Sequence, residues 1–209
     1  MRQPFVIQHP LVQHKMGLIR SLGIGVKNFR ELVDELSSIL VYEISRELKT
    51  HPKEIEVWSG RLEIQKIAAE KIMFVPIIRA GISMMHGALR ILPLAKVNFS
   101  GIFRDENTAT PQIYYRNIIK PTQGDVAIIL DPMLATGGSM CETIQLLKKA
   151  GYKEIMAVCL ICAPEGVKRV QTEHPDLILY TASIDEKLNE KKYILPGLGD
   201  AGDRVFETG

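Results

Sequence analysis

A run of acidic, hydroxyl and glycine residues follows an apolar segment near the middle of the chain. The segment 126–130 reads as a buried strand, and 140–150 reads as a helix. Between them lie Asp131, Pro132, Met133, Leu134, Ala135, Thr136, Gly137, Gly138 and Ser139. The last four of these would present backbone N–H groups and hydroxyls at a helix N-terminus, where donors and the helix dipole favour an anion. We therefore expect a phosphate cradle, with Asp131 accepting from sugar hydroxyls joined to that phosphate. No Gly-Lys-Ser/Thr follows, which disfavours an ATPase loop.

Two arginines follow predicted strands. Arg79 comes after the apolar strand 73–77, and Arg104 comes after the alternating strand 97–103. Residues that end parallel strands meet at one edge of a sheet, and a guanidinium can grip a phosphate through two parallel hydrogen bonds. The alternative is an ordinary surface arginine in a turn, with Arg104 paired to Asp105 or Glu106.

The chain ends in a glycine-rich segment. Gly197, Gly199 and Gly202 form a literal GxGxxG, but only seven residues remain after it. A dinucleotide fingerprint needs a following helix and strand, so this interpretation fails. We expect a tight loop whose backbone N–H and C=O groups line a small pocket, the alternative being a purely structural turn.

The elements that would position these residues form a strand–loop–helix–strand unit. All-apolar strands indicate a parallel sheet covered on both faces. Strands are expected at 73–77, 97–103, 126–130, 155–162 and 177–181, and helices at 28–49, 82–92, 140–150 and 164–172. Asn28 is the expected cap of the first helix. The segment 53–71 is ambiguous, with a short strand at 55–58 and weak helical character at 61–69. Residues 105–123 read as a long excursion or hairpin, and the chain from 185 as irregular.

The charge balance excludes binding classes that depend on bulk charge. Lys plus Arg is 26 and Asp plus Glu is 24, so the net charge is +2. A protein held on nucleic acid by bulk charge needs a dense basic face. Three cysteines, no signal-peptide pattern and no apolar stretch long enough to cross a bilayer indicate a reduced, cytoplasmic protein.

The first thirty residues carry five basic residues and no acid. They are Arg2, Lys15, Arg20, Lys27 and Arg30. We expect an exposed arm that docks on a neighbouring subunit, with an anion or effector contact as the alternative.

No metal ligand set is predicted. Cys159 and Cys162 have CxxC spacing but lie inside an apolar strand, so buried structural cysteines are expected. The five histidines show no ligand spacing, and none is assigned to a metal.

Together the three clusters resemble the uracil phosphoribosyltransferase family. The run from Asp131 to Ser139 resembles its phosphoribosyl-diphosphate (PRPP) signature, and Asp131-Pro132 is the form typical of the uracil enzymes. Segment 75–81 resembles the pyrophosphate loop, 103–106 the approach to a mobile hairpin, and 193–204 the uracil loop. His9 to Val12 with Phe29-Arg30 matches the N-terminal pattern. Segments 17–27 and 57–71 depart from it.

The resemblance implies an α/β, type I phosphoribosyltransferase-like core. Its central parallel sheet is flanked by helices, with a protruding hairpin and a small C-terminal hood. Residues 1–209 would form one domain, with an N-terminal arm and helix at 1–50 and a base-binding region at 185–209.

The implied reaction moves the 5-phosphoribosyl group of PRPP to N1 of uracil, giving UMP and diphosphate in pyrimidine salvage. Mg²⁺ would travel with the diphosphate. The implied PRPP-binding residues are Arg79, Arg104, the run Asp131 to Ser139 and Asp200. The implied uracil-binding residues are Ile194, Gly199, Asp200 and Ala201, and the implied catalytic residues are Arg104, Asp131 and Asp200.

The resemblance also implies a homodimer or higher homo-oligomer and, as in some relatives, a GTP effector. No nucleic acid or membrane partner is expected. Two alternatives stay open: a phosphoribosyltransferase for another base, and a nucleotide-sensing RNA-binding regulator built on the same fold.

Overall fold

A computed structural model of the chain describes residues 2–104, 111–115 and 118–208, with 102–104 and 111–115 described by their backbone alone. The central sheet has the order β1-β11-β10-β8-β4-β6-β7, with β5 paired to β4 and β9 to β10. Its strands are β1 (Phe5–Val6), β4 (Ile72–Ile78), β5 (Lys96–Val97), β6 (Ser100–Arg104), β7 (Pro111–Tyr115), β8 (Val126–Leu130), β9 (Met133–Leu134), β10 (Glu154–Cys162) and β11 (Ile178–Ile184). Within this sheet, and among its described strands, only the β6–β7 pairing is antiparallel.

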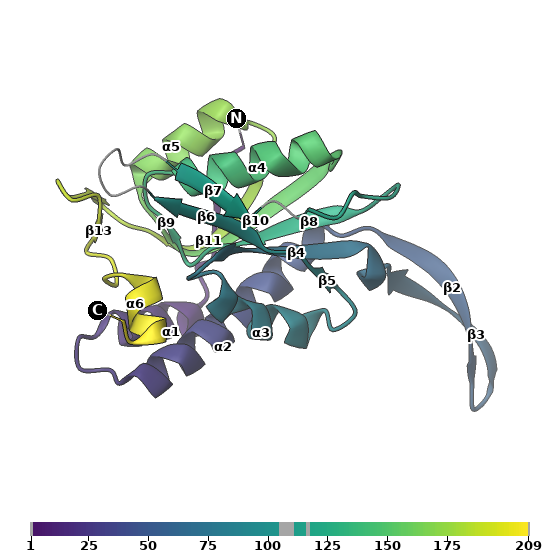
Figure 1. Ribbon diagram of the computed structural model, residues 1–209. Coiled ribbons are helices and arrows are strands. Elements are labelled where there is room, and N and C mark those ends of the chain that lie inside the picture. Colours follow the sequence, from purple (N-terminus) through teal and green to yellow (C-terminus); the bar gives the residue numbers. More distant parts are fainter. Residues whose placement is uncertain (1, 105–110, 116–117, 209) are drawn as a thin grey trace.

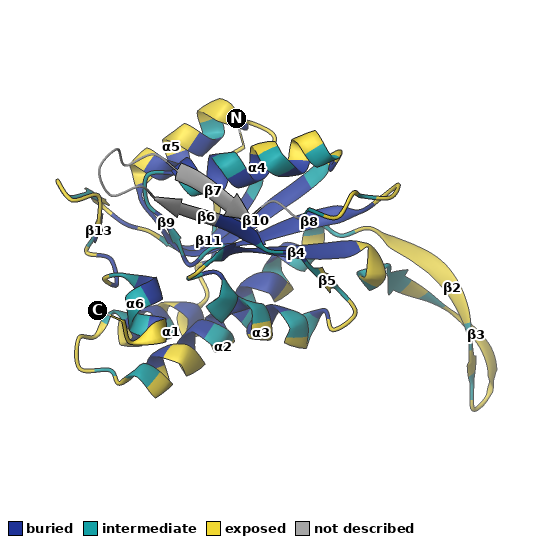
Figure 2. Ribbon diagram, in the orientation of Figure 1, coloured by how far each residue is buried: buried dark blue, intermediate teal, exposed yellow. Residues whose placement is uncertain are grey.

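Helices cover both faces of this sheet (Figure 1). On one face lie α1 (Pro10–Arg20), α2 (Val26–Ile44) and α3 (Ile82–Ile91); on the other lie α4 (Gly138–Ala150) and α5 (Pro164–Glu173). Each face has its own apolar core, and the strands between them are buried (Figure 2). The prediction of a parallel sheet covered on both sides is confirmed.

The strands that carry the predicted site lie side by side. Ala127 of β8 pairs in register with Met73 of β4 on one side and Ile155 of β10 on the other. Because these pairings are parallel, the segments that follow the strands emerge at one edge of the sheet. The unit β8–loop–α4–β10 therefore matches the sequence prediction closely.

The N-terminal segment is not an exposed arm. β1 pairs with β11, and α1 buries Val12, Met16 and Ile19 in the core. The expectation of an arm was wrong because these apolar residues, spaced three and four apart, form a short amphipathic helix.

The long helix starts and stops earlier than predicted. α2 begins at Val26 after Gly25 and ends at Ile44, followed by the 3₁₀ turn η1 (Ser45–Glu47). Asn28 lies inside the helix and is not its cap. The Ser45 hydroxyl donates to the carbonyl of Tyr42 at 2.6 Å, which offers the backbone an alternative to helix continuation.

Residues 50–67 form a long antiparallel hairpin. β2 (Thr50–Val57) and β3 (Gly60–Ile67) pair over their full length and reach away from the body (Figure 1). The weak helical character expected at 61–69 was wrong except at η2 (Ala69–Lys71), because cross-strand pairing overrides helix propensity here. The excursion predicted at 105–123 contains β7, whereas 105–110 and 116–117 lie outside the described residues.

The C-terminal segment is more ordered than expected. β12 (Lys187–Leu188) pairs with β13 (Ile194–Leu195), and α6 (Ala201–Phe206) packs against α2. This is the small hood above the sheet edge. Among the described residues, no helix has both the length and the apolar character needed to span a bilayer.

Candidate functional site

A pocket of about 270 Å³ opens where β4 and β8 end. It brings together the segment after β4, the loop from β8 to α4 and the hood, which are far apart in the sequence. Its lining includes Ile77, Ile78, Arg79, Ala80, Asp131, Met133, Leu134, Ala135, Thr136, Gly137, Gly138, Ser139, Met140 and Asp200. Of the predicted PRPP residues whose side chains the structure describes, only Pro132 is not part of this lining.

Asp131 lies directly after β8 at the bottom of this loop. Its Oδ1 accepts from the N–H of Met133 at 3.3 Å, and its own N–H donates to the carbonyl of Val158 on β10. Burial raises the pKa of Asp131 to about 7, and the bond from Met133 offsets only part of that shift. The carboxyl is thus poised to titrate near neutral pH, as groups at binding sites often are.

The start of α4 has the geometry of an anion cradle. Gly137 precedes the helix with φ of +78°, a conformation that favours glycine, and none of the side chains that the structure describes caps the helix. The N–H groups of the first turn therefore remain for a ligand. Gly166 of α5 packs so closely on the carbonyls of Leu134 and Ala135 that a Cβ there would collide with them. This contact packs α5 directly against the loop between β8 and α4 and fixes the position of that loop.

Arg79 sits in a tight turn between β4 and α3. The turn requires glycine at position 81, because a Cβ on Gly81 would overlap the carbonyl of Leu130 and the backbone of Ile77. The Arg79 guanidinium, which is more than half exposed, donates to Asp203 of α6 at 3.3 Å and to Thr208 at 3.4 Å. Asp203 was not singled out in the sequence, since its partner lies 124 residues away.

Asp200 is the one predicted base-binding residue that lines the pocket. It caps α6, with its Oδ1 accepting from the N–H of Asp203 at 2.9 Å. Gly199 precedes it with φ of +78°, while Ile194 and Ala201 are buried in the same hood outside the pocket lining. Arg104 ends β6, and its side chain lies outside the described part of the chain.

The hood is fastened to α1 by a buried ion pair. Arg20 donates to both carboxylate oxygens of Asp185 at 2.6 Å and to the carbonyl of Gly197 at 2.8 Å. Asp185 also accepts from the Gly197 N–H and the Ser183 hydroxyl. Burial disfavours its charge, but these bonds together hold the pKa of Asp185 below its ordinary value. Neither residue was predicted as part of the site.

A second arginine fixes the same loop from α6. Arg204 donates to the carbonyls of Leu198 and Ile19 at 2.8 Å and to that of Ser21 at 2.9 Å. Its guanidinium stacks over the Phe29 ring at 4.2 Å. The glycine-rich loop is thus held in place by side chains on both sides.

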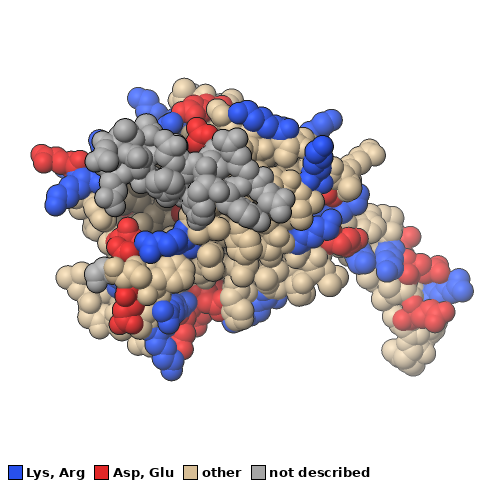
Figure 3. All heavy atoms as spheres, viewed as in Figure 1, with Lys and Arg blue, Asp and Glu red and all other residues tan. Residues whose placement is uncertain are grey.

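Four of the five basic residues of the first thirty have side-chain partners within the fold. Lys15 pairs with Glu35 and Lys27 with Glu31, and Arg30 donates to the carbonyl of Val205. On the face drawn in Figure 3, basic and acidic side chains are interspersed and do not form a basic field. On this face, positive and negative side chains therefore compensate one another locally.

A larger cavity of about 450 Å³ lies at the opposite end of the sheet strands, at the base of the β2–β3 hairpin. Its lining includes Leu48, His51, Lys71, Gly124 and Glu154, and none of the predicted site residues. Ligands of open α/β sheets bind outside the carboxyl ends of the strands. The smaller pocket is the one that has both this position and the loop chemistry.

The fold is that of the type I phosphoribosyltransferases. Over 74% of this chain and 78% of the other, the fold matches a hypoxanthine-guanine phosphoribosyltransferase from Bacillus anthracis with a TM-score of 0.51 at 14% identity. A hypoxanthine phosphoribosyltransferase from Staphylococcus aureus matches with a TM-score of 0.50 at 10% identity, over 87% and 84% of the chains. These two likenesses show the fold alone.

The family is shown by the sequence. A family model described as uracil phosphoribosyltransferase matches residues 6–208, so the chain belongs to the uracil phosphoribosyltransferase family. The structure is also similar to that of protein AQ2163 from Aquifex aeolicus, with a TM-score of 0.95 and 38% identity over 99% of both chains. The recognition made from the sequence motifs is confirmed, and it implies PRPP and a base as substrates.

Proposed function

We propose that this enzyme transfers the 5-phosphoribosyl group of PRPP to N1 of uracil, giving UMP and diphosphate. The observation that carries the proposal is the convergence of Arg79, Asp131, the start of α4 and Asp200 on one pocket. An anion cradle, a sugar-binding carboxylate and an arginine within one pocket fit a phosphorylated sugar that bears a diphosphate.

Each group in the pocket has a role in this reaction. The N–H groups of Thr136 to Ser139 would hold the 5′-phosphate, and Asp131 would accept from the ribose hydroxyls. The bond from the anomeric carbon to diphosphate breaks, the bond to N1 of uracil forms, and the N1 proton leaves. Arg79 and Arg104 would neutralise the departing diphosphate, which is where stabilising charge lowers the barrier.

The pocket also fits Mg²⁺ bound with the diphosphate. The carboxylates of Asp131 and Asp200 and the hydroxyls of Thr136 and Ser139 are in its lining, and oxygen is the ligand that Mg²⁺ prefers. When bound, the ion would supply charge to the leaving group. We assign it no direct protein ligand.

The hood supports uracil as the base. Arg20 and Arg204 occupy the carbonyls of Gly197 and Leu198, so the loop is held before any base arrives. Ile194, Gly199, Asp200 and Ala201 would read the base largely through main-chain atoms. Fixed donors and acceptors matched to the N3–H and carbonyls of uracil would refuse cytosine, because a buried group would be left unpaired.

The test is an assay with PRPP, Mg²⁺ and one base at a time. We expect UMP from uracil, and no product from cytosine, hypoxanthine or guanine at equal concentration. A folded protein that makes a purine nucleotide instead would support the alternative of another base. A protein that makes no nucleotide and binds a defined RNA in a salt-dependent way would support the RNA-binding regulator.

We extend the proposal to the oligomeric state and the cellular location of the protein. Residues 1–209 act as one domain in a cytoplasmic homodimer or higher homo-oligomer. The β2–β3 hairpin supports self-association, because it carries a fully exposed Trp58 at its turn and a half-exposed Leu62. Sedimentation at several protein concentrations tests the assembly.

GTP remains a proposed effector. The pairing of Lys15, Arg20, Lys27 and Arg30 weakens the hypothesis that the N-terminal basic residues bind it. A flat activity curve against GTP would remove this part of the proposal.

A further inference from the structure

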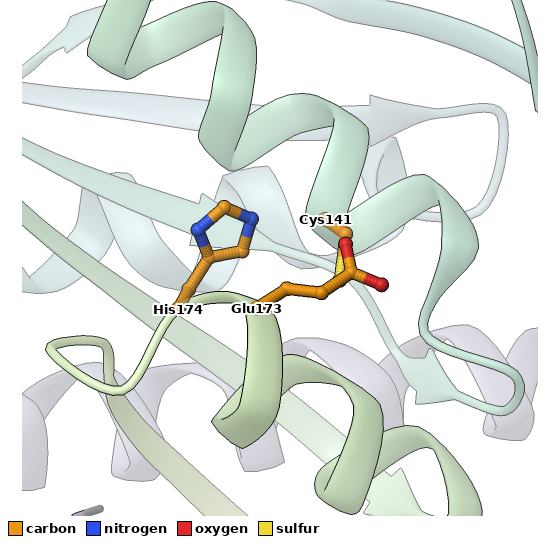
Figure 4. Close-up of side chains that lie close together, drawn as sticks. All are labelled: Cys141, Glu173 and His174. Carbon is orange, nitrogen blue, oxygen red and sulfur yellow. The ribbon is translucent and has the colours of Figure 1, made fainter.

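Cys141, Glu173 and His174 form a compact cluster outside the pocket. Cys141 lies in the first turn of α4, Glu173 ends α5 and His174 follows it. One sulfur, one carboxylate oxygen and one ring nitrogen all lie within 4.8 Å of one another. Figure 4 shows the imidazole and the carboxylate converging on the thiol from neighbouring elements.

The histidine is buried with one nitrogen left over. His174 is only 5% exposed, and its Nδ1 lies 3.4 Å from the ammonium of Lys148. Its Nε2 is buried and has no hydrogen-bond partner within the described part of the chain. A buried nitrogen in this state is costly, and a bound ion or an ordered water is what would satisfy it.

The backbone and the neighbours hold these groups in place. The His174 N–H donates to the carbonyl of Val170 at 2.7 Å, ending α5. Arg169 donates to Oε1 of Glu173 at 2.8 Å, which orients the carboxylate and leaves the second oxygen for another partner. Lys148 is also paired to Asp176 at 2.8 Å, so its charge near the ring is compensated.

The thiol is not suited to act as a nucleophile. The Cys141 side chain is buried, and the Glu173 carboxylate lies within 4.8 Å of its sulfur. A reactive cysteine needs a stabilised thiolate, usually in an electropositive and partly open setting. A divalent metal ion would supply the missing positive charge, because a coordinating thiol loses its proton outright.

We propose that Cys141, Glu173 and His174 bind a zinc-class divalent cation through Sγ, a carboxylate oxygen and Nε2. Thiolate, imidazole and carboxylate are the donors that Zn²⁺ takes, and thiolate is not a ligand for Mg²⁺ or Ca²⁺. Tetrahedral zinc ligands lie roughly 3.4–3.6 Å apart, so modest side-chain movements would close the cluster. Glu173 is exposed and provides the entry side, and water would fill the fourth position.

This site would be separate from the Mg²⁺ that travels with the diphosphate. Cys141 donates its N–H to the carbonyl of Gly137 at 2.9 Å, so a metal here would brace the turn that forms the cradle. The proposal does not depend on which base the enzyme uses.

The test uses the full-length protein, stripped with a chelator and kept in millimolar Mg²⁺ to occupy oxygen sites. Zn²⁺ is titrated in competition with a chromophoric chelator, and Co²⁺ is then added to look for thiolate-to-metal charge-transfer absorption. We expect one tight ion per chain with a thiolate band. Cys141→Ser and His174→Gln should each weaken binding at least about tenfold and remove or shift that band.

Cys159→Ala serves as the matched control, since it removes another buried thiol from β10 outside this cluster. It should bind Zn²⁺ as the parent does. Thermal unfolding without metal checks that each variant is folded, and added Zn²⁺ should raise the Tm of the parent and the control only. Equal Zn²⁺ affinity in all four proteins, or a Co²⁺ complex without a thiolate band, overturns the proposal.

Discussion

Arg20 and Asp185 are joined by two hydrogen bonds of 2.6 Å across a separation of 165 residues in the sequence. The pair ties the end of α1 to the start of the hood, and both partners also bond Gly197. It therefore acts as a brace for the loop that is proposed to read the base. The carboxylate is almost completely buried, so its charge is compensated by the Arg20 guanidinium together with the Ser183 hydroxyl and the Gly197 N–H.

Arg20→Met is expected to unfold the hood locally and destabilise the protein by about 3 kcal/mol, because it leaves a buried charge without its partner. The KM for uracil should rise more than the KM for PRPP. Chemical denaturation and steady-state kinetics measure the two effects. Lys27→Met is the control: it breaks an exposed pair with Glu31 and should cost less than about 1 kcal/mol. Equal effects of the two substitutions on the uracil KM would contradict the brace.

Asp131→Asn should separate stability from activity. The pKa of Asp131 is about 7 in the folded chain against 3.8 for an ordinary aspartate. A carboxyl with a raised folded pKa opposes folding once the pH exceeds the unfolded value, and the penalty is complete above the folded value. The variant should therefore be more stable than the parent at pH 8 and nearly equal to it at pH 4. Its kcat/KM for PRPP should fall at least about a hundredfold.

Asp125→Asn provides the opposite case for the same measurement. Burial disfavours the charge of Asp125, but hydrogen bonds from the backbone and hydroxyl of Thr122 lower its pKa overall. Its stabilising contribution is present above the unfolded pKa and is lost as the pH falls through the folded one. This variant should be less stable than the parent at pH 8. At pH 8, a gain in stability for Asp125→Asn, or a loss for Asp131→Asn, would contradict the opposite pKa shifts given for these two carboxyl groups.

Gly81→Ala should disrupt the turn that carries Arg79. The added Cβ would overlap backbone atoms of Ile77 and Leu130, which cannot yield as a flexible side chain can. We expect a loss of about 2–4 kcal/mol. Gly17→Ala is the matched control, because that position is in α1 and faces open space. The control should be neutral or stabilising by up to about 1 kcal/mol. Comparable Tm values for the two variants would show that the turn tolerates a Cβ.

The core of the fold was accessible from the sequence because its signals are local. Apolar strands such as 126–130, followed by a glycine-containing turn and an amphipathic helix, specify a β–α–β unit without long-range information. The same is true of the cradle and of Asp131, which lie within that unit. The expectation that these residues line one pocket then followed from the rule that parallel strands end at one edge of a sheet.

The features that the sequence did not predict depend on pairing between residues that do not lie in one continuous segment. The β2–β3 hairpin is stabilised by cross-strand partners such as Ile55 opposite Leu62, a pairing that single-segment periodicity does not reveal. The links from Arg20 to Asp185 and from Arg79 to Asp203 likewise join residues that are 165 and 124 positions apart in the sequence. The first thirty residues looked like a free arm because the partners of Arg20 and Arg30 lie far along the sequence, at Asp185 and Val205.

Trp58→Ser should weaken self-association. Trp58 is fully exposed at the turn of the hairpin, where a large apolar side chain has no structural task within one chain. Sedimentation velocity over a range of concentrations should show a shift toward smaller species, with the Tm of dilute protein unchanged. Tyr42→Ser, at an exposed position on α2, serves as the control and should leave the assembly intact. A Trp58 variant that assembles like the parent would place the interface elsewhere.

Arg104→Ala should impair catalysis much more than folding. Arg104 closes β6, which pairs with β4 near the turn that carries Arg79, so its backbone is positioned toward the same edge of the sheet. Removing a cation that neutralises the leaving diphosphate should lower kcat/KM for PRPP by about a hundredfold, as loss of one charge-stabilising donor typically does. Denaturation should change by less than about 1 kcal/mol. Arg104→Lys tests geometry against charge: a lysine keeps the charge but not the planar fork, so it should recover only part of the loss. Kinetics equal to those of the parent in the alanine variant would remove Arg104 from the site and leave Arg79 as its principal arginine.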